Sequence, residues 1–194
     1  MPPRYCVYAA SSNRIDNVYL QAAQNLGELI AEAGGVIVYG GGSSGLMGRL
    51  ADGALARGGE VIGIIPRFMD ELEWAHKGLT ELITVADLHE RKRIMAEGAD
   101  GIIALPGGCG TLEELAEVLT WKRLGLYLNP IVLVNIARYY DPLIQMLENM
   151  VSEKFMDPRH MSMWSVVNTP EEVVDAIAKA PRWNSDSVGF AVPR

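Results

Sequence analysis

Short apolar runs alternate with longer helical patterns along almost the whole chain, and this alternation limits the possible folds more than any other feature. The seven runs expected to form strands are Arg4–Ala9, Val36–Tyr39, Val61–Ile65, Leu82–Val85, Gly101–Leu105, Ile131–Asn135 and Ser165–Val167. Helical patterns lie between them, near residues 16–33, 44–57, 88–98, 111–124, 139–153 and 170–180. Several strand runs are apolar almost throughout, which is typical of strands covered on both faces. The sequence therefore predicts an α/β protein with a doubly wound, mostly parallel sheet of about seven strands and helices on both faces.

Length and composition indicate one globular domain. The chain has 194 residues, of which 49% are hydrophobic, and it contains no linker, repeat or low-complexity run. A chain of this size can bury a sizeable core without disulfides or a structural metal. We expect the domain to span residues 1–180. Residues 181–194 show no clear period, so we expect a loosely ordered tail there.

Charge and cysteine content narrow the possible partners. There are 17 Lys and Arg against 24 Asp and Glu, a net charge of −7, which argues against a nucleic-acid binder that relies on positive charge. No apolar run approaches the roughly 20 residues of a membrane span. Cys6 and Cys109 are the only cysteines, and two free thiols suit a reducing compartment. The N-terminal apolar run is too short for a signal peptide, so we expect a cytoplasmic protein.

A glycine-rich turn, Gly40-Gly-Gly-Ser-Ser-Gly-Leu-Met-Gly48, follows the second expected strand. A strand, a glycine-rich turn and a helix in this order can aim backbone N–H groups at a phosphate. The turn matches the dinucleotide-binding pattern G-x-G-x-x-G, but Pro66-Arg67 ends the next strand where an acidic residue is expected. A P-loop is excluded because Leu46 occupies the lysine position. The turn either contacts a ligand, with Gly42 and Ser43 as candidates, or serves close packing alone.

A second glycine-rich turn, Pro106-Gly-Gly-Cys-Gly-Thr-Leu-Glu-Glu114, follows the fifth expected strand. Three glycines within four residues leave the backbone bare at the carboxyl end of a strand, where open α/β sheets bind ligands. We expect Thr111 to cap the next helix. Glu113 and Glu114 then lie in its first turn, where acids either complement the helix dipole or act on a ligand.

A basic cluster, His89-Glu-Arg-Lys-Arg93, lies near the start of the preceding helix. Positive residues near a helix N-terminus oppose the dipole unless an anion binds there. The cluster is either a solvated charged face or the cationic half of an anion site. Since it lies one βα unit from the second glycine turn, we favour a site for a small anion.

Taken together, these motifs resemble those of the LOG ("lonely guy") family. The second turn is similar to the family signature PGGxGTxxE, the first to GGGxxGLMG, and His89-Glu-Arg-Lys92 to MHxRK, with Leu88 in place of the usual methionine. The resemblance extends from about Tyr5 to about Ala180. It implies a Rossmann-like fold, a homodimer, and hydrolysis of the N-glycosidic bond of N6-modified adenosine 5′-monophosphates, giving free base and ribose 5-phosphate. AMP itself is a substrate of many members.

The same resemblance implies roles for individual residues. It nominates Arg91 and Glu114 as catalytic. The positions it nominates for substrate binding are Lys92, Gly108, Cys109, Gly110, Thr111, Leu112 and Glu113, and Glu73 and Thr120 match further contact positions. The backbone from Gly107 to Thr111, at the helix N-terminus, can hold the 5′-phosphate. Cys109 fills a variable position of the motif and is not expected to be a nucleophile. Glu114 could stabilise an oxocarbenium-like sugar or act as general base, and Arg91 could hold the phosphate, the ribose or Glu114 itself; the sequence leaves these roles open.

Other functions make different demands on the chain. A non-catalytic nucleotide or cofactor carrier of similar fold would need the glycine loops but not the Arg91/Glu114 pair. A lysine decarboxylase, a label often given to this family, would need pyridoxal phosphate on a lysine, and none of the five lysines lies in a recognisable cofactor motif. His76, His89 and His160 lack metal-ligand spacing, so we expect neither metal nor cofactor. We expect the dimer interface to bury part of the 111–124 helix together with the large apolar residues of the Trp121–Tyr127 segment and Leu128.

Overall fold

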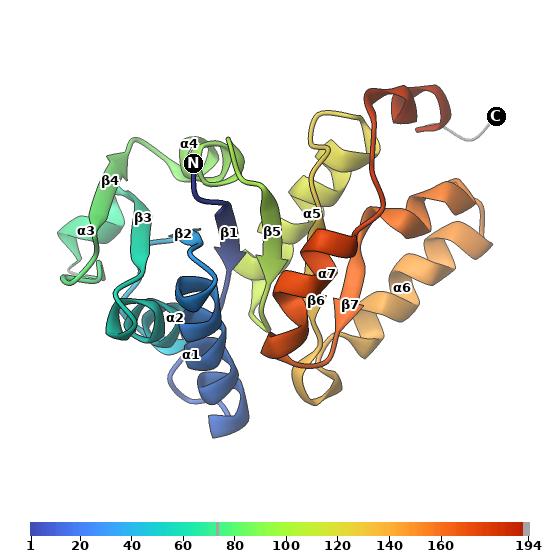
Figure 1. Cartoon of the computed structure of the whole chain (residues 1–194). Coiled ribbons are helices and arrows are strands. Elements are labelled where there is room, and N and C mark those ends of the chain that lie inside the picture. The colour runs from blue at the N-terminus through green and yellow to red at the C-terminus, as the bar shows by residue number, and fades with distance from the viewer. Residues whose placement is uncertain (73, 192–194) are drawn as a thin grey trace.

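Seven parallel strands form a single sheet in the computed structural model, which describes residues 1–72 and 74–191 (Figure 1). They are β1 (Arg4–Tyr8), β2 (Val36–Tyr39), β3 (Glu60–Pro66), β4 (Glu81–Val85), β5 (Gly101–Ala104), β6 (Ile131–Val134) and β7 (Ser165–Val167). The strand order is β4-β3-β2-β1-β5-β6-β7, and all six neighbouring pairs are parallel. The predicted doubly wound α/β sheet and its Rossmann-like arrangement are confirmed.

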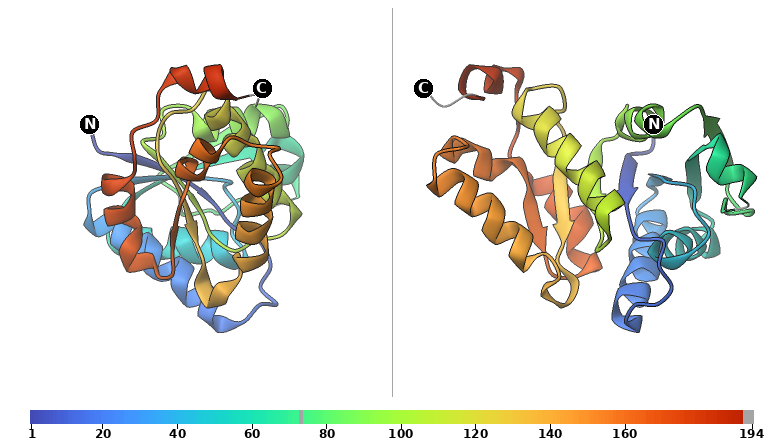
Figure 2. Two further views of the ribbon diagram at one scale, coloured as in Figure 1. Left: turned by 90° about the vertical axis from the view of Figure 1, so that its right-hand side faces the viewer. Right: turned by 180° about the vertical axis from the view of Figure 1, so that it is seen from behind.

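Helices cover both faces of the sheet and bury its apolar strands between them (Figure 2). One face packs against α1 (Asn17–Glu32), α2 (Gly45–Ala56) and α7 (Val173–Lys179). The other packs against α4 (Leu88–Ala96), α5 (Cys109–Arg123) and α6 (Asp141–Ser152). Side chains of each strand alternate between the two cores, so that Cys6 and Tyr8 join one while Tyr5 and Val7 join the other. The strands are nearly continuous apolar runs because both of their faces are buried.

The short helix α3 (Arg67–Glu71) was not predicted. It has five residues, none of them buried, and therefore leaves no periodic apolar signal in the sequence. Short 3₁₀ segments η1 (Ile136–Arg138), η2 (Pro158–Met163) and η3 (Pro170–Glu172) also connect the larger elements. η1 and η3 connect a strand to the next helix, and η2 connects α6 to β7.

Two of the three helix N-caps predicted from the sequence are found in the structure, and the third is not. The Asp87 carboxylate accepts hydrogen bonds from the N–H groups of His89 and Glu90, both at 2.8 Å, and begins α4. Thr169 and Glu172 form a complete capping box before α7. Thr111 was expected to cap α5, and this is wrong. The helix begins two residues earlier, at Cys109, with Gly108 as its N-cap, so Thr111 lies buried inside the first turn.

The strand order defines where a ligand can enter. From β1 the chain builds outward through β2, β3 and β4, and then crosses to β5 and continues outward on the other side. The loops leaving β1 and β5 therefore diverge to opposite faces at the middle of the sheet. This is the topological switch point, where open α/β sheets carry a crevice outside the carboxyl ends of the strands.

The segment that follows α7 contacts the domain. It contains η4 (Ser185–Phe190), and the Trp183 indole N–H donates to the carbonyl of Lys122 at 2.7 Å. The Arg123 guanidinium donates to the Ala191 carbonyl, and Ser187 and Ala191 are buried. The described part of the predicted tail therefore lies against the C-terminal end of α5.

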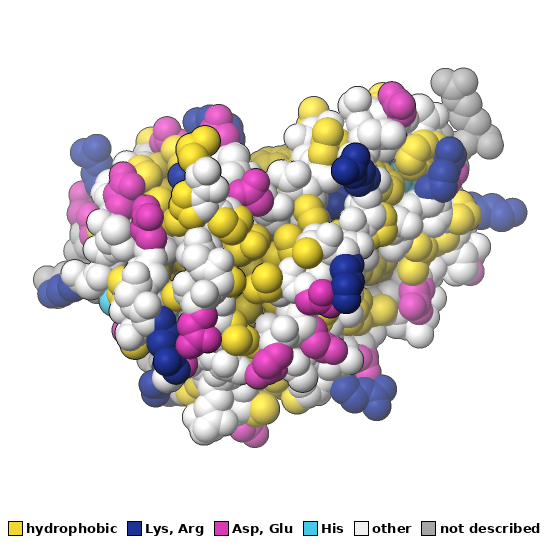
Figure 3. Space-filling view, viewed as in Figure 1, with side chains coloured by type: hydrophobic (Ala, Val, Ile, Leu, Met, Phe, Trp, Pro, Cys, Tyr) yellow, Lys and Arg dark blue, Asp and Glu magenta, His cyan; other side chains and the backbone are white. Residues whose placement is uncertain are grey.

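The surface carries charges of both signs. Figure 3 shows hydrophobic side chains gathered in a hollowed band near the middle of one face, with Lys, Arg, Asp and Glu scattered around it. Among the described residues, no helix combines the length and apolar character that crossing a membrane requires.

Candidate active site

A cavity of about 540 Å³ opens at the switch point. Its polar wall comes from the loops that follow three parallel strands: Ser11 and Ser12 after β1, Gly40 and Gly42–Ser44 after β2, and Gly108–Thr111 after β5. Arg91 of α4 and Glu114 of α5 also line it. The volume lies in the range of small-molecule sites, which typically measure about 300–1,000 Å³.

The N-terminus of α5 presents free backbone donors to this cavity. The first hydrogen bond of the helix runs from the Leu112 N–H to the Gly108 carbonyl, at 3.0 Å. The N–H groups of Cys109, Gly110 and Thr111 precede that bond and have no partner within the helix. No atom lies within 4 Å of where a Cβ would stand on Gly108 or Gly110, so the backbone there is open to a ligand. An anion can therefore bind to donors that also carry the positive end of the helix dipole.

The N-terminus of α2 lies across the same cavity, but the chain itself occupies donors there. The Gly45 N–H donates to the Asn13 side-chain oxygen at 2.8 Å, and the Met47 N–H donates to the Ala10 carbonyl at 3.2 Å. Gly45 has a φ of +62°, and a Cβ there would lie 2.5 Å from the Ser11 backbone. The first glycine turn thus contributes Gly42 and Ser43 to the cavity wall, while close packing explains its glycine at position 45.

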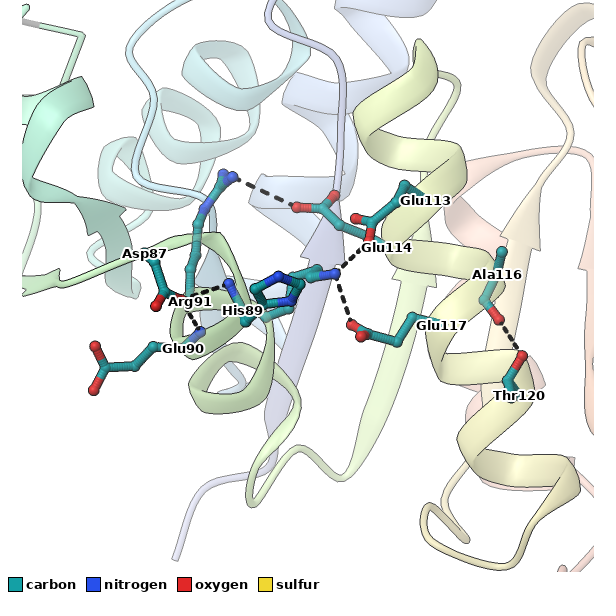
Figure 4. A network of polar contacts seen from close by, with 10 residues as sticks. Asp87, His89, Glu90, Arg91, Glu113, Glu114, Ala116, Glu117 and Thr120 are labelled. Atoms are coloured by element: carbon teal, nitrogen blue, oxygen red, sulfur yellow. Dashed lines mark hydrogen bonds and ion pairs between the residues drawn. The ribbon is translucent and has the colours of Figure 1, made fainter.

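The guanidinium of Arg91 joins three elements that are distant in the sequence. Its Nε donates to the Ile64 carbonyl of β3 and one Nη to the Gly40 carbonyl after β2, both at 3.1 Å. Its other Nη lies 3.7 Å from a Glu114 carboxylate oxygen (Figure 4). A Cβ on Gly40 would come within 1.9 Å of the Arg91 Nη, so only glycine leaves room for this side chain. Arg91 is therefore a positioned cation, because its Nε and one Nη are held by backbone carbonyls from two different parts of the chain.

Glu114 is the buried acid of the cavity, with 8% of the residue exposed. Burial raises the pKa of its carboxyl to about 7, although the nearby Arg91 charge lowers it, and the Glu113 charge raises it further. At 3.7 Å the Arg91 contact is an ion pair without a hydrogen bond, so the loss of hydration dominates. A carboxyl that titrates near neutral pH suits proton transfer, since both of its forms are populated there.

Lys92 is buried and is not among the residues that line the cavity; its side chain reaches from α4 to carboxylates of α5. Its ammonium group pairs with Glu113 and lies 3.2 Å from a Glu117 oxygen. Burial alone would lower the pKa of Lys92, but its hydrogen bonds to these two carboxylates outweigh that effect and raise it. Lys92 thus links α4 to α5 through ion pairs with two carboxylates of α5.

Several other residues suggested by the family resemblance also lie outside the cavity. Leu112 is 48% exposed, and the exposed Thr120 donates its hydroxyl to the Ala116 carbonyl at 2.8 Å (Figure 4). Gly107 lies just before the cavity wall, with Thr111 packed where its Cβ would be. Glu73 lies outside the described residues. The structure thus brings together Arg91, Glu114, Gly108–Thr111, Gly42 and Ser43.

The apolar wall of the cavity was not predicted. It includes Met47, Met69, Trp74, Met95 and Ile65. The Trp74 carbonyl accepts the Ser43 N–H at 3.0 Å, and the His76 N–H donates to the Gly41 carbonyl at 2.9 Å, which places residues 74–76 against the first glycine turn. Ser11 and Ser12 were also missed, although a polar pair directly after a central strand could have identified them. Met69 and Trp74 carry no such signal.

Metal or lysine chemistry has no evident location in the cavity. Over the described ranges, no group of three or more His, Cys, Asp and Glu side chains is arranged to hold a metal ion. Of the described residues that line the cavity, none is a lysine. Cys109 lines the cavity as an exposed free thiol, and Cys6 is buried in the core.

Comparison with known proteins identifies close relatives. Residues 47–177 match a family model described as "Possible lysine decarboxylase". A cytokinin riboside 5′-monophosphate phosphoribohydrolase of Rhodococcoides fascians is 48% identical over 160 residues, which cover 82% of this chain and 81% of that protein. A protein of the same name from Arabidopsis thaliana is 36% identical over 198 residues, covering 97% of this chain and 92% of its own.

Solved structures share the fold at lower sequence identity. The molybdenum cofactor binding protein of Rippkaea orientalis superposes with a TM-score of 0.70 at 25% identity, covering 92% of this chain and 96% of its own. A molybdenum cofactor carrier protein of Chlamydomonas reinhardtii gives a TM-score of 0.72 at 22% identity, covering 93% and 98%. At 22% identity, the similarity to the Chlamydomonas reinhardtii protein shows a shared fold and nothing more.

The raised pKa of Glu114 predicts a pH-dependent stability. Between its ordinary pKa of 4.5 and about 7, the folded chain binds more protons at this carboxyl than the unfolded chain. The contribution of Glu114 to the free energy of unfolding therefore falls as the pH rises through this window. Glu114→Gln removes this dependence, so between pH 5 and 8 the variant should gain about 2 kcal/mol relative to the wild type.

Urea unfolding of the ligand-free proteins at several pH values measures this difference. Glu148→Gln, at an exposed position on α6, is the control and should follow the wild-type curve. Parallel pH profiles for the wild type and Glu114→Gln would contradict the assignment of a raised pKa to this group.

Proposed function

This chain belongs to the family of the cytokinin riboside 5′-monophosphate phosphoribohydrolases, and on that premise we propose that it hydrolyses the N-glycosidic bond of adenosine 5′-monophosphates. The products are the free base, either adenine or an N6-substituted adenine, and ribose 5-phosphate. The chain is thus an N-glycosyl hydrolase acting on nucleotides.

The observation that carries this proposal is the placement of the Arg91/Glu114 pair beside the free N-terminus of α5 in one cavity. The N–H groups of Cys109, Gly110 and Thr111 suit a 5′-phosphate, because they offer several donors and partial positive charge. The α2 N-terminus is a weaker candidate, since Asn13 and Ala10 already accept two of its N–H groups. Glu114 follows Thr111 by three residues on the same helix, so it lies about one turn from the proposed phosphate site.

The reaction requires water to add to C1′ while the bond from C1′ to the base breaks. The sugar develops positive charge in the transition state, and the base nitrogen takes up a proton as it leaves. An ionised Glu114 stabilises that charge and accepts a proton from the attacking water. Its pKa of about 7 makes the proton available for return to the base. Arg91 acts by keeping its charge close to Glu114 through its bonds to the Gly40 and Ile64 carbonyls.

We predict that cleavage depends on the phosphate group. AMP or isopentenyl-AMP should be cleaved, and the corresponding nucleosides hardly at all. A charge-assisted contact contributes about 1.5–3 kcal/mol, so the preference should be at least about tenfold to a hundredfold in kcat/KM. Chromatography of the released base from a panel of nucleosides and 5′-monophosphates measures it. Equal turnover of adenosine and AMP by the pure protein would exclude phosphate recognition at α5.

We also predict that Glu114→Gln abolishes turnover and preserves nucleotide binding. The amide keeps the shape of the side chain but cannot carry the negative charge or the proton. The loss in kcat should be about 10²–10⁴-fold. AMP affinity should be kept or rise, because a charge that repels phosphate is removed. Calorimetry and a base-release assay test both parts.

Glu148→Gln is a better control here than Glu117→Gln, because Glu117 pairs with the buried Lys92. The Glu148 variant should retain full turnover. If the folded Glu114→Gln protein retains most of its turnover, the carboxyl serves only as a partner of the helix dipole.

A non-catalytic carrier is the alternative function. The Rippkaea orientalis relative, described as a molybdenum cofactor binding protein, favours it through shared fold at 25% identity. A carrier has no use for an acid poised near neutral pH inside the cavity. The higher identity to the phosphoribohydrolases, 48% and 36%, also supports the enzyme. Lysine decarboxylation lacks support, since no lysine is among the described cavity residues.

We further propose that the protein is a cytoplasmic homodimer. Two free cysteines, one buried and one exposed, support a reducing compartment. Leu124, Leu126 and Leu128 are 42%, 73% and 40% exposed and supply an apolar surface after α5. Tyr127, which was expected at the interface, is buried in the core instead, so the leucines carry the proposal. The molar mass measured by light scattering at micromolar concentration should exceed that of one chain. A mass near 21.2 kDa would contradict the dimer.

A further inference from the structure

The loop that follows β6 lies beside the glycine turn that begins α5. β5 and β6 are parallel neighbours, with Ala104 paired to Leu133, so their carboxyl ends reach the same edge of the sheet. The loop after β5 leads into the proposed phosphate site at Gly108–Thr111. The loop after β6, residues 135–140, contains Tyr139 and Tyr140 and is not part of the cavity wall.

Both tyrosines bond to backbone carbonyls at the start of the glycine turn, one within it and one on the residue just before it. The Tyr139 hydroxyl donates to the Gly107 carbonyl and the Tyr140 hydroxyl to the Leu105 carbonyl, each at 2.6 Å. The two rings meet edge to face with their centroids 5.3 Å apart, and Tyr19 of α1 also packs edge to face against Tyr139, with a centroid distance of 6.0 Å. The carbonyls of Leu105 and Gly107, on either side of Pro106, are thus held by a rigid aromatic stack.

The backbone that presents Tyr139 is itself strained. Ala137 and Arg138 have φ values of +49° and +62°, in the left-handed region that residues other than glycine rarely adopt. Such a conformation persists only where neighbouring contacts enforce it. Here Asn135 accepts the Tyr140 N–H at 2.7 Å and donates to Asp141 at 2.8 Å. The surrounding bonds therefore hold the loop in the shape that brings Tyr139 to Gly107.

Holding the Gly107 carbonyl constrains Gly108, the N-cap residue that directly precedes the phosphate donors of Cys109, Gly110 and Thr111. The carbonyl of Gly107 and the N–H of Gly108 belong to one planar peptide unit and point in opposite directions. A hydrogen bond to the first therefore fixes the direction of the second. Gly108 is free of side-chain crowding and begins the cavity wall at α5, so without such a bond its peptide could rotate.

We propose that Tyr139 is a positioning residue for phosphate recognition, acting through the Gly107–Gly108 peptide. It does not touch the nucleotide. Its hydroxyl keeps the backbone donors before α5 arranged for an anion, so its loss weakens binding of the phosphate and leaves the base end of the cavity unchanged. The inference rests on the proposed function, because it assumes that the phosphate binds at α5.

Tyr139→Phe tests the proposal with little risk to the fold. The residue is 44% exposed, so removing its hydroxyl creates no buried cavity. One neutral hydrogen bond predicts a loss of about three- to tenfold in ribose 5-phosphate affinity and a similar rise in KM for AMP. Adenine affinity and melting temperature should stay at the wild-type values. Isothermal calorimetry with ribose 5-phosphate and with adenine, together with AMP kinetics, gives these values.

Tyr19→Phe is the matched control. It removes a hydroxyl from the same aromatic stack, and no hydrogen bond of that hydroxyl to another described residue is found. This variant should bind ribose 5-phosphate as the wild type does. Unchanged ribose 5-phosphate affinity in Tyr139→Phe, or an equal loss for adenine, would overturn the positioning role while wild-type turnover still supported the proposed function. Failure of the wild type both to cleave AMP and to bind ribose 5-phosphate would overturn both.

Discussion

Parallel pairing of all seven strands places every carboxyl end of the sheet at one edge, and the candidate site depends on this constraint. The loops after β1, β2 and β5 meet at that edge, although β1 ends at Tyr8, β2 at Tyr39 and β5 only at Ala104, with two further strands between β2 and β5 in the sequence. Parallel strands also require helices between them, so helix N-termini return to the same edge. The cavity, its backbone donors and its two charged side chains are all consequences of this geometry.

Within the cavity, the balance between burial and charge determines the chemistry of Glu114. A guanidinium nearby would be expected to keep a carboxylate ionised. Arg91 instead uses its donors on the Ile64 and Gly40 carbonyls, and it approaches Glu114 only to 3.7 Å. The loss of water around a group that is 8% exposed then outweighs the attraction. The same two residues with a direct hydrogen bond would form a structural ion pair rather than an acid that titrates near neutral pH.

The sequence was sufficient to predict the sheet, because apolar runs that are buried on both sides leave a strong local signal. All seven strands were predicted within a few residues, and in the structure residues of the second glycine turn line one cavity together with Arg91. Long side chains were harder to place. Lys92 follows Arg91 directly, yet it points to Glu113 and Glu117, because neighbouring residues on a helix face different directions. The apolar wall at Met69 and Trp74 could not be predicted, since it belongs to a short connection without periodicity.

Helix α5 is anchored at both of its ends, which has a practical consequence for experiments with this protein. Its N-terminus forms the cavity wall, while its C-terminal end holds the last described segment through the Lys122 carbonyl and the Arg123 guanidinium. A helix of 15 residues is about 22 Å long. Val188, which is 60% exposed on η4, therefore offers an attachment point for a fluorophore or a solid support at the far end of α5. A probe attached there leaves the mouth of the cavity open to nucleotides.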